Sequence, residues 1–223
     1  MHMSRKFALL SSALLFGCGA QEHAVESDTT ALAGVSREQA SATHESSAVT
    51  TSTADDPSAF LPAGATLVDT VYGDLTGRGT ADALIVFASG ATETDRLGVG
   101  TARTVVLLTR DASGRLQNAA ENARIVPCER CGGIAGDPYA YARIEAGAVT
   151  LAVAGGSRER WFHDYVFRYA PERGTWQLER VVRGISDRQT DLQTQTELTA
   201  ADLGVVGFAD FDPASLSPAP VLD

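Results

Sequence analysis

The chain has 223 residues and a formal net charge of −10 at pH 7, with 28 acidic and 18 basic side chains. A charge of this sign excludes binding to nucleic acid or to anionic lipid through bulk electrostatic attraction. Beyond a short N-terminal stretch, no apolar run approaches the roughly 20 residues that a membrane-spanning helix requires.

The N-terminal residues have the parts of a secretion signal. Arg5 and Lys6 precede an apolar run over 7–16, and small residues follow that run. The run is too short to remain in a bilayer as a permanent helix. The sequence therefore predicts that residues 1–17 are a signal peptide that is removed on export.

A cysteine follows this signal directly. The order Leu15-Phe16-Gly17-Cys18 resembles the bacterial lipobox, although Phe16 is bulkier than the usual occupant. The resemblance implies that Cys18 is the lipidation site and carries acyl chains such as palmitate, which form a stable anchor when two or three are present. Gly19 stands where that family's inner-membrane retention signal has Asp, which implies a lipid-anchored protein of the cell envelope at the outer membrane. The alternative is an ordinary signal peptide that happens to contain a cysteine.

Composition divides the mature chain into a tether, a domain and a tail. Residues 18–59 follow the cleavage site, are mostly Ser, Thr, Ala, Glu and Asp, and contain no Phe, Trp or Tyr. Such a segment buries too little apolar surface to offset its ordering entropy, so we expect a disordered tether. Residues 60–212 are expected to form a single β-rich domain, and 213–223 a flexible tail.

Short apolar runs separated by turn residues predict strands in this domain. The runs cover 67–72, 83–88, 103–110, 115–126, 162–169 and 176–182, with one helical turn over 199–203. Within 144–153, a tight Ala146-Gly147 turn joins two further strands as a hairpin. Strands at short spacing indicate an all-β fold, mainly an antiparallel meander that is propeller-blade-like or a sandwich. On the run 162–169, His163 shares a face with Tyr165 and Phe167, which predicts a packed or partly exposed histidine.

The segment 73–82, Gly-Asp-Leu-Thr-Gly-Arg-Gly-Thr-Ala-Asp, resembles the FG-GAP or VCBS repeat of integrin-like propellers. In that family, Asp and Asn oxygens of this loop hold Ca²⁺. Here the matching positions are Asp74, Thr76 and Asp82, and Arg78 replaces a carboxylate. We therefore expect a degenerate loop without calcium or another cofactor, in which Arg78 bridges Asp74 and Asp82. One repeat cannot close a propeller of typically 4–8 blades.

Two further cysteines, Cys128 and Cys131, lie in a Gly-rich stretch. A redox pair requires a helix N-terminus, and a zinc site requires two more ligands. In an exported protein, a disulfide between Cys128 and Cys131 is favoured over both.

The stretches 128–139 and 155–169, together with the loop at 73–82, resemble a group of uncharacterised bacterial lipoproteins. This resemblance implies a shared fold and no established activity. Because exposed Arg and Trp often anchor recognition surfaces, the candidate ligand surface comprises Asp137, Arg158, Arg160 and Trp161. The opposing interpretation is that Trp161 is a core residue and both arginines are solvated.

These observations predict a non-catalytic interaction or structural domain, with the membrane reached through the lipid and an envelope protein or glycan as partner. The rival is an envelope hydrolase that uses Asp and His residues. It requires an acid–base pair in one cleft, and Asp137 and Asp164 are its first candidates. If both carboxylates lie in one cleft, the rival is favoured.

Overall fold

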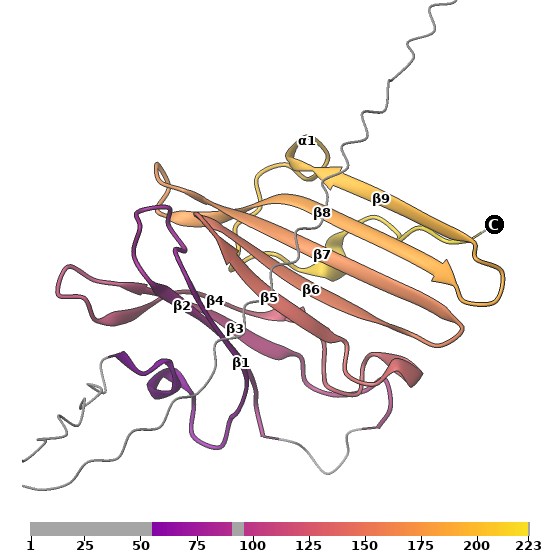
Figure 1. Cartoon of the computed structure of the whole chain (residues 1–223), viewed down its shortest axis with the longest axis horizontal. Coiled ribbons are helices and arrows are strands. Elements are labelled where there is room, and N and C mark those ends of the chain that lie inside the picture. Colours follow the sequence, from indigo (N-terminus) through magenta and orange to yellow (C-terminus); the bar gives the residue numbers. More distant parts are fainter. Residues whose placement is uncertain (1–54, 91–95, 223) are drawn as a thin grey trace, which may run out of the picture. The chain divides into compact units, whose positions relative to one another are not determined.

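The computed structural model describes residues 55–90 and 96–222 (Figure 1). The predicted signal peptide, Cys18 and nearly all of the tether lie outside the described residues. Among the described residues, no helix is long and apolar enough to cross a membrane.

Two antiparallel meanders make up the fold, which confirms the predicted all-β class. The first sheet has the order β1-β2-β3-β4 and the second β5-β6-β7-β8-β9. The strands are β1 (Thr66–Gly73), β2 (Asp82–Ala88), β3 (Arg103–Arg110), β4 (Leu116–Val126), β5 (Tyr139–Glu145), β6 (Ala148–Gly156), β7 (Glu159–Ala170), β8 (Thr175–Asp187) and β9 (Gln193–Thr199). Short helical turns are η2 (Pro57–Phe60), η3 (Gly133–Ala135), α1 (Ala200–Leu203) and η4 (Pro213–Ser215).

Every predicted strand and the helical turn at 199–203 have a counterpart in these elements, while β9 was not predicted. Its sequence, Gln-Thr-Gln-Thr-Glu-Leu-Thr, has no alternation of apolar and polar residues. It is a strand because its backbone pairs with β8 from Arg180 to Ser186. An edge strand of this kind needs no apolar face of its own when its neighbour supplies the hydrogen bonds.

One large core lies between the two sheets. Leu84 and Val86 of β2 belong to this core together with Val149 and Leu151 of β6, and all four residues are fully buried. The alternate residues of β2 form a smaller core on the other face of the first sheet, which Phe60 and the residues around η2 cover. Both faces of β2 are therefore buried, which explains its continuous apolar sequence.

The two sheets approach each other closely at β1 and β5. A Cβ atom added at Gly73 would lie 2.7 Å from the Cβ of Ile144, so the contact requires glycine. Nearby, the Tyr139 hydroxyl donates to Asp69 Oδ2 at 2.6 Å. Burial and this carboxylate raise the pKa of Tyr139 strongly, because both disfavour a phenolate. The pair joins β5 to β1 with a charge-assisted hydrogen bond.

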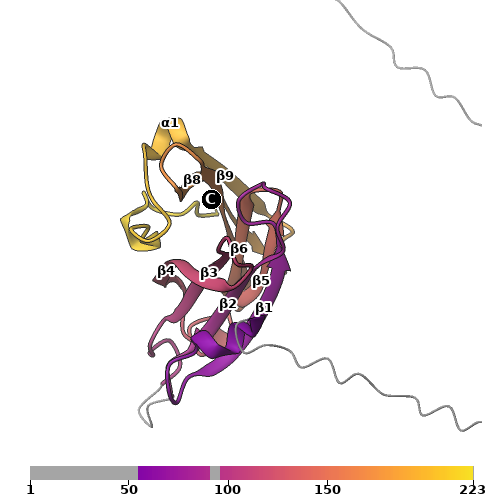
Figure 2. The ribbon, with the colours of Figure 1, turned by 90° about the vertical axis from the view of Figure 1, so that its left-hand side faces the viewer.

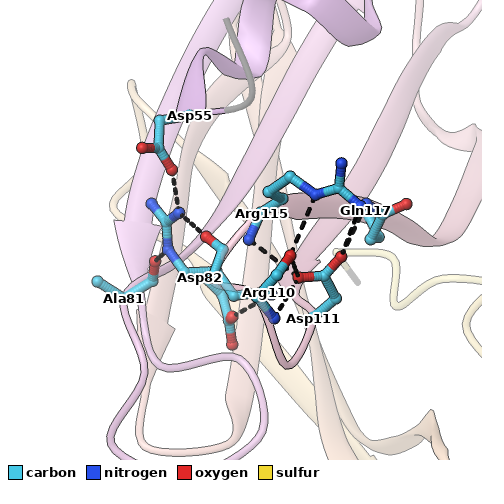
Figure 3. Close-up of polar contacts among 9 residues, drawn as sticks. Asp55, Ala81, Asp82, Arg110, Asp111, Arg115 and Gln117 are labelled. Atoms are coloured by element: carbon cyan, nitrogen blue, oxygen red, sulfur yellow. Dashed lines mark hydrogen bonds and ion pairs between the residues drawn. The ribbon is translucent and has the colours of Figure 1, made fainter. Parts of the chain in front are cut away.

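The loop between β1 and β2 is held by carboxylates. Asp82 Oδ1 accepts from the Arg110 amide at 2.9 Å, and the Arg110 Nε donates to the Ala81 carbonyl at 2.8 Å (Figure 3). The Arg110 guanidinium also pairs with Asp55, which ties the N-terminal end of the described domain to β3. These contacts fix where β2 begins and where β3 ends.

Candidate functional site

A row of aromatic side chains lies along β7 on the face that is directed at the main core. The ring centroids of Trp161 and His163 are 5.3 Å apart, and those of His163 and Tyr165 are 6.0 Å apart. Tyr165 then contacts Phe211 edge-on at 5.2 Å. The row follows the period-2 alternation of a strand, as predicted for His163 and Tyr165.

Two glycines on neighbouring strands give the aromatic rings of β7 their positions. Gly155 pairs with Trp161, and a Cβ atom at Gly155 would lie 2.4 Å from the indole ring. Gly184 pairs with Phe162 in the same way on the opposite face of the sheet, with a distance of 2.2 Å. Cross-strand glycines allow an aromatic ring to lie flat over the backbone. Gly155 therefore leaves the space that the indole ring of Trp161 occupies over β6, a role that the sequence did not reveal.

The C-terminal segment, residues 205–222, provides the wall opposite these rings. Figure 2 shows this segment (yellow) next to β8 and β9. Its two phenylalanines, Phe208 and Phe211, are buried in the main core, and both contact the Phe167 ring edge-on. The buried Asn122 side chain of β4 donates to the carbonyls of Phe208 and Phe211 at 2.7 and 2.8 Å. The segment is thus attached to both sheets.

An apolar groove of about 490 Å³ lies between the aromatic row and this wall. Its volume is in the range of small-molecule sites, about 300–1,000 Å³. The sheet contributes Trp161, His163 and Tyr165, and the C-terminal segment contributes Ala214 and Ala219. The other lining residues are Arg124, Ile125, Pro127, Val153, Gly184, Ile185, Pro213 and Pro220. Among the described lining residues there is no carboxylate, thiol, serine or threonine.

His163 and Tyr165 are two titratable residues that line the groove next to each other. The Nδ1 of His163 lies 2.9 Å from the Tyr165 hydroxyl. Burial, together with the positive charge of Arg183, lowers the pKa of His163 to about 4. Burial raises the pKa of Tyr165 well above its usual value. Both groups are therefore neutral at pH 7, so they offer hydrogen bonds to a ligand but little driving force for proton transfer.

The four residues of the predicted ligand surface do not form one cluster. Only Trp161 lies in the groove. Asp137 is held by both terminal nitrogens of the buried Arg103 at 2.7 Å, and it caps the Tyr139 amide. Arg158 pairs with Asp187 at 2.6 Å. Arg160 lies one position before Trp161 and therefore on the opposite face of β7.

The two carboxylates proposed for a hydrolase are also separate. Asp137 is bound to Arg103 in the loop before β5. Asp164 lies on the face of β7 opposite His163, where burial raises its pKa against the opposing effect of Arg143 and Arg180. The alternation of β7 keeps Asp164 out of the groove, so no acid–base pair of these residues is assembled there.

The loop that resembles a calcium site has a structural role in this chain. Asp74 accepts from the amides of Thr76, Arg78 and Gly79 at 2.6–3.2 Å. Asp82 Oδ2 accepts from the Leu75 amide at 3.2 Å. The expected bridge by Arg78 is wrong, because its Nε donates instead to Thr76 Oγ1 at 2.9 Å.

Leu75, in the middle of this loop, enters the main core and is fully buried. The indole of Trp176 on β8 donates to the Leu75 carbonyl at 2.7 Å. The Asp74 carbonyl accepts from the Gly147 amide in the β5–β6 turn at 2.8 Å. The loop therefore attaches the first sheet to the second.

The sulfur atoms of Cys128 and Cys131 are 2.15 Å apart, at disulfide distance, as predicted. The pair lies just after β4, close to the end of the groove that Pro127 lines. Among the residues that the structure describes, no group of three or more His, Cys, Asp or Glu side chains could hold a metal ion.

Comparison with known proteins gave no relatives: no family model, curated protein or solved structure matches this chain. The site must therefore be interpreted from its own geometry.

Proposed function

We propose that this chain is a lipid-anchored protein of the cell envelope whose β domain is a non-catalytic binding module for a small molecule with an apolar body. The observation that carries the proposal is the groove between Trp161, Tyr165 and the C-terminal segment. Its walls are apolar and aromatic, which suits burial of an apolar surface. The neutral His163 supplies a polar contact that orients a ligand.

The chemistry of the groove supports binding rather than hydrolysis. A hydrolase requires a nucleophile, or an activated water, beside a general base. His163 at pKa about 4 is a weak base, and its Nδ1 is engaged with Tyr165. The described lining residues provide no serine, threonine, cysteine or carboxylate to act with it.

Binding of N-phenyl-1-naphthylamine, a neutral apolar fluorophore, tests this function. We expect one probe per chain, and roughly tenfold weaker binding for Trp161→Ala, because a large aromatic contact is lost. Ala219→Trp should block the groove from the exposed side of its wall. Tyr141→Ala and Ala112→Trp are matched controls at exposed sites on β5 and in the β3–β4 turn. Unchanged probe binding in both groove variants would refute the assignment of the site.

We also propose that the lipid is attached at Cys18 and that the protein lies in the outer membrane. The support is the order of cations, apolar run, small residue and cysteine at positions 5–18. Cys18→Ser should abolish labelling by radioactive palmitate and leave the precursor at its full mass, whereas Cys128→Ser should still be labelled and processed. Labelling of the Cys18→Ser chain would show that the lipid is not on this residue.

We propose further that the domain folds without calcium. Asp74 and Asp82 direct their oxygens at backbone amides, so the charge that a cation would compensate is already stabilised by hydrogen bonds. A chelator should leave the thermal unfolding midpoint unchanged. A rise of several degrees on addition of millimolar Ca²⁺ would contradict this.

A further inference from the structure

Arg183 of β8 is buried without a carboxylate partner. Its side chain is only 4% exposed. Nη1 donates to the Ser217 carbonyl at 2.6 Å, and Nη2 has two long contacts, with Ser217 Oγ at 3.3 Å and the Pro218 carbonyl at 3.4 Å. Nε is buried and has no hydrogen-bond partner. Within the described part of the chain, no carboxylate lies at ion-pair distance from this guanidinium.

Two exposed arginines of the same domain show what the Nε–Nη2 edge of a guanidinium binds when a carboxylate is in reach. Arg158 places Nε and Nη2 on Asp187 at 2.8 and 2.6 Å, and Arg168 places Nε on Glu179 at 2.8 Å. The Nε of the buried Arg103 has no partner, but the two terminal nitrogens of that residue bind Asp137. In Arg183 that same edge has one empty position and one position with long contacts. A guanidinium that is buried against neutral acceptors carries a desolvation cost, which a bidentate anion would offset.

Arg183 is close to several residues that line the groove. Arg183 is the direct cross-strand partner of His163, and its charge contributes to lowering the pKa of that ring. The next residues on β8, Gly184 and Ile185, line the groove, as does Ala219, which follows the contacted Pro218. Arg183 is not itself one of the described residues that line the groove; its guanidinium lies beside it, against the Ser217 and Pro218 carbonyls of the C-terminal segment.

We infer that the groove's ligand carries a single carboxylate on an apolar chain, with the chain against Trp161 and Tyr165 and the carboxylate on Nε and Nη2 of Arg183. This inference rests on the proposed function of the groove. The long Nη2 contacts are the ones that the anion replaces. Because Nε is enclosed, residues 217–220 move away from Arg183 when the ligand enters.

The charge and the shape of the site together select this class of ligand. A fully polar anion would leave the apolar walls unmatched, and a neutral apolar molecule would leave Arg183 without a counter-charge. A carboxylate matches the fork of the guanidinium in two parallel hydrogen bonds. The described lining residues contain no acidic group that would repel it.

Isothermal titration of the wild-type chain with three compounds tests the inference without any variant. Decanoate has both features, decanamide has the chain without the charge, and butyrate has the charge with a short chain. We expect decanoate to bind at least roughly tenfold more tightly than decanamide, because a charge-assisted pair is lost in the amide. Butyrate should be weaker still, since each buried methylene contributes about fourfold in affinity.

Two arginine variants then locate the charge recognition. Arg183→Gln should bind decanoate and decanamide equally well, whereas Arg158→Gln, which removes a paired arginine on the surface, should keep the preference of the wild type. The amide NMR signals of Ser217 and Ala219 should shift on addition of decanoate and much less on addition of decanamide.

The possible results separate this inference from the function on which it rests. Equal affinity of the wild type for decanoate and decanamide, with both weakened by Ala219→Trp, would overturn the role of Arg183 and leave the groove as the binding site. Failure of both compounds and of the neutral fluorophore would overturn both proposals. A preference for decanoate that survives in Arg183→Gln would also refute the inference.

Discussion

The buried side-chain amide of Asn122 attaches the C-terminal segment to the first sheet, next to an exposed hydrogen bond from Arg124 to the Ala209 carbonyl at 2.7 Å. Besides donating to the carbonyls of Phe208 and Phe211, the Asn122 side chain accepts at Oδ1 from the amides of Arg124 and Ile125 at 2.7 and 3.1 Å. The side chain is 3% exposed. All of its hydrogen-bonding capacity is therefore used in a place that water does not reach.

Replacing Asn122 with Asp keeps the shape and removes both donors. An oxygen would then face two carbonyl oxygens at 2.7 and 2.8 Å. Two buried acceptors lose their partner at about 1–3 kcal/mol each, and the new carboxylate is desolvated as well. We expect a loss of roughly 3–5 kcal/mol in the free energy of unfolding. In a domain of this size, that loss lowers the Tm by roughly 10 °C or more.

Urea denaturation of Asn122→Asp and Asn118→Asp measures this effect. Asn118 is an exposed residue on the same strand, and its amide contacts only Glu121, at 3.3 Å. We expect its variant to remain within about 0.5 kcal/mol of the wild type. At pH 4, Asn122→Asp should recover part of its loss, because a protonated carboxyl can donate one hydrogen bond. If the two variants were equally stable at pH 7, the hydrogen bonds of the Asn122 side chain would contribute nothing to stability and the reasoning would be refuted.

Two further predictions concern the groove. Because the pKa of His163 is about 4 in the folded chain, the unfolded chain binds a proton between about pH 4 and 6.5 that the folded chain does not. The contribution of His163 to the free energy of unfolding therefore rises with pH across this window. We expect a rise of roughly 2 kcal/mol, a value reduced because the ring is partly exposed to solvent. Urea titrations should show this rise as the difference between the wild type and His163→Asn, and parallel pH profiles would contradict it. Gly155→Ala should cost about 1–3 kcal/mol by overpacking, since the new Cβ would lie 2.4 Å from the Trp161 ring and 2.8 Å from the Gly132 carbonyl. In a Trp161→Ala background the same change should cost less, and a double-mutant cycle with no coupling would rule out the proposed contact.

Local pattern was enough to predict most of the strands. In β6, the alternation of Val149, Leu151 and Val153 indicated a strand with one buried face, and all three side chains lie in the main core. The predicted packing of His163 and the disulfide-distance pair of Cys128 and Cys131 also followed from the sequence. These features depend on period-2 geometry or on residues three positions apart, so neighbours along the chain specify them.

The groove could not be predicted in this way, because its walls come from β4, β6, β7, β8 and the C-terminal segment. Sequence identified Trp161 as a candidate but gave no signal for Arg124, Ala214 or Ala219. Phe208 and Phe211, which lie inside the predicted domain, were the available clue, since two aromatic residues just before residue 213 indicate that the chain is still buried there.

Partner choice among charged residues was likewise decided by the tertiary structure. Asp137 and Arg158 looked available for a ligand in sequence, yet each is paired, with Arg103 and Asp187. Arg183 did not stand out, yet it is the buried arginine that the described carboxylates leave without an ion pair. The sequence by itself determined most of the strands, because their period-2 patterns are local, whereas the export signal at residues 1–17 stays a prediction. Which charges meet was set by the docking of two sheets and a C-terminal segment, because an ion pair depends on a few ångströms between residues that are tens of positions apart.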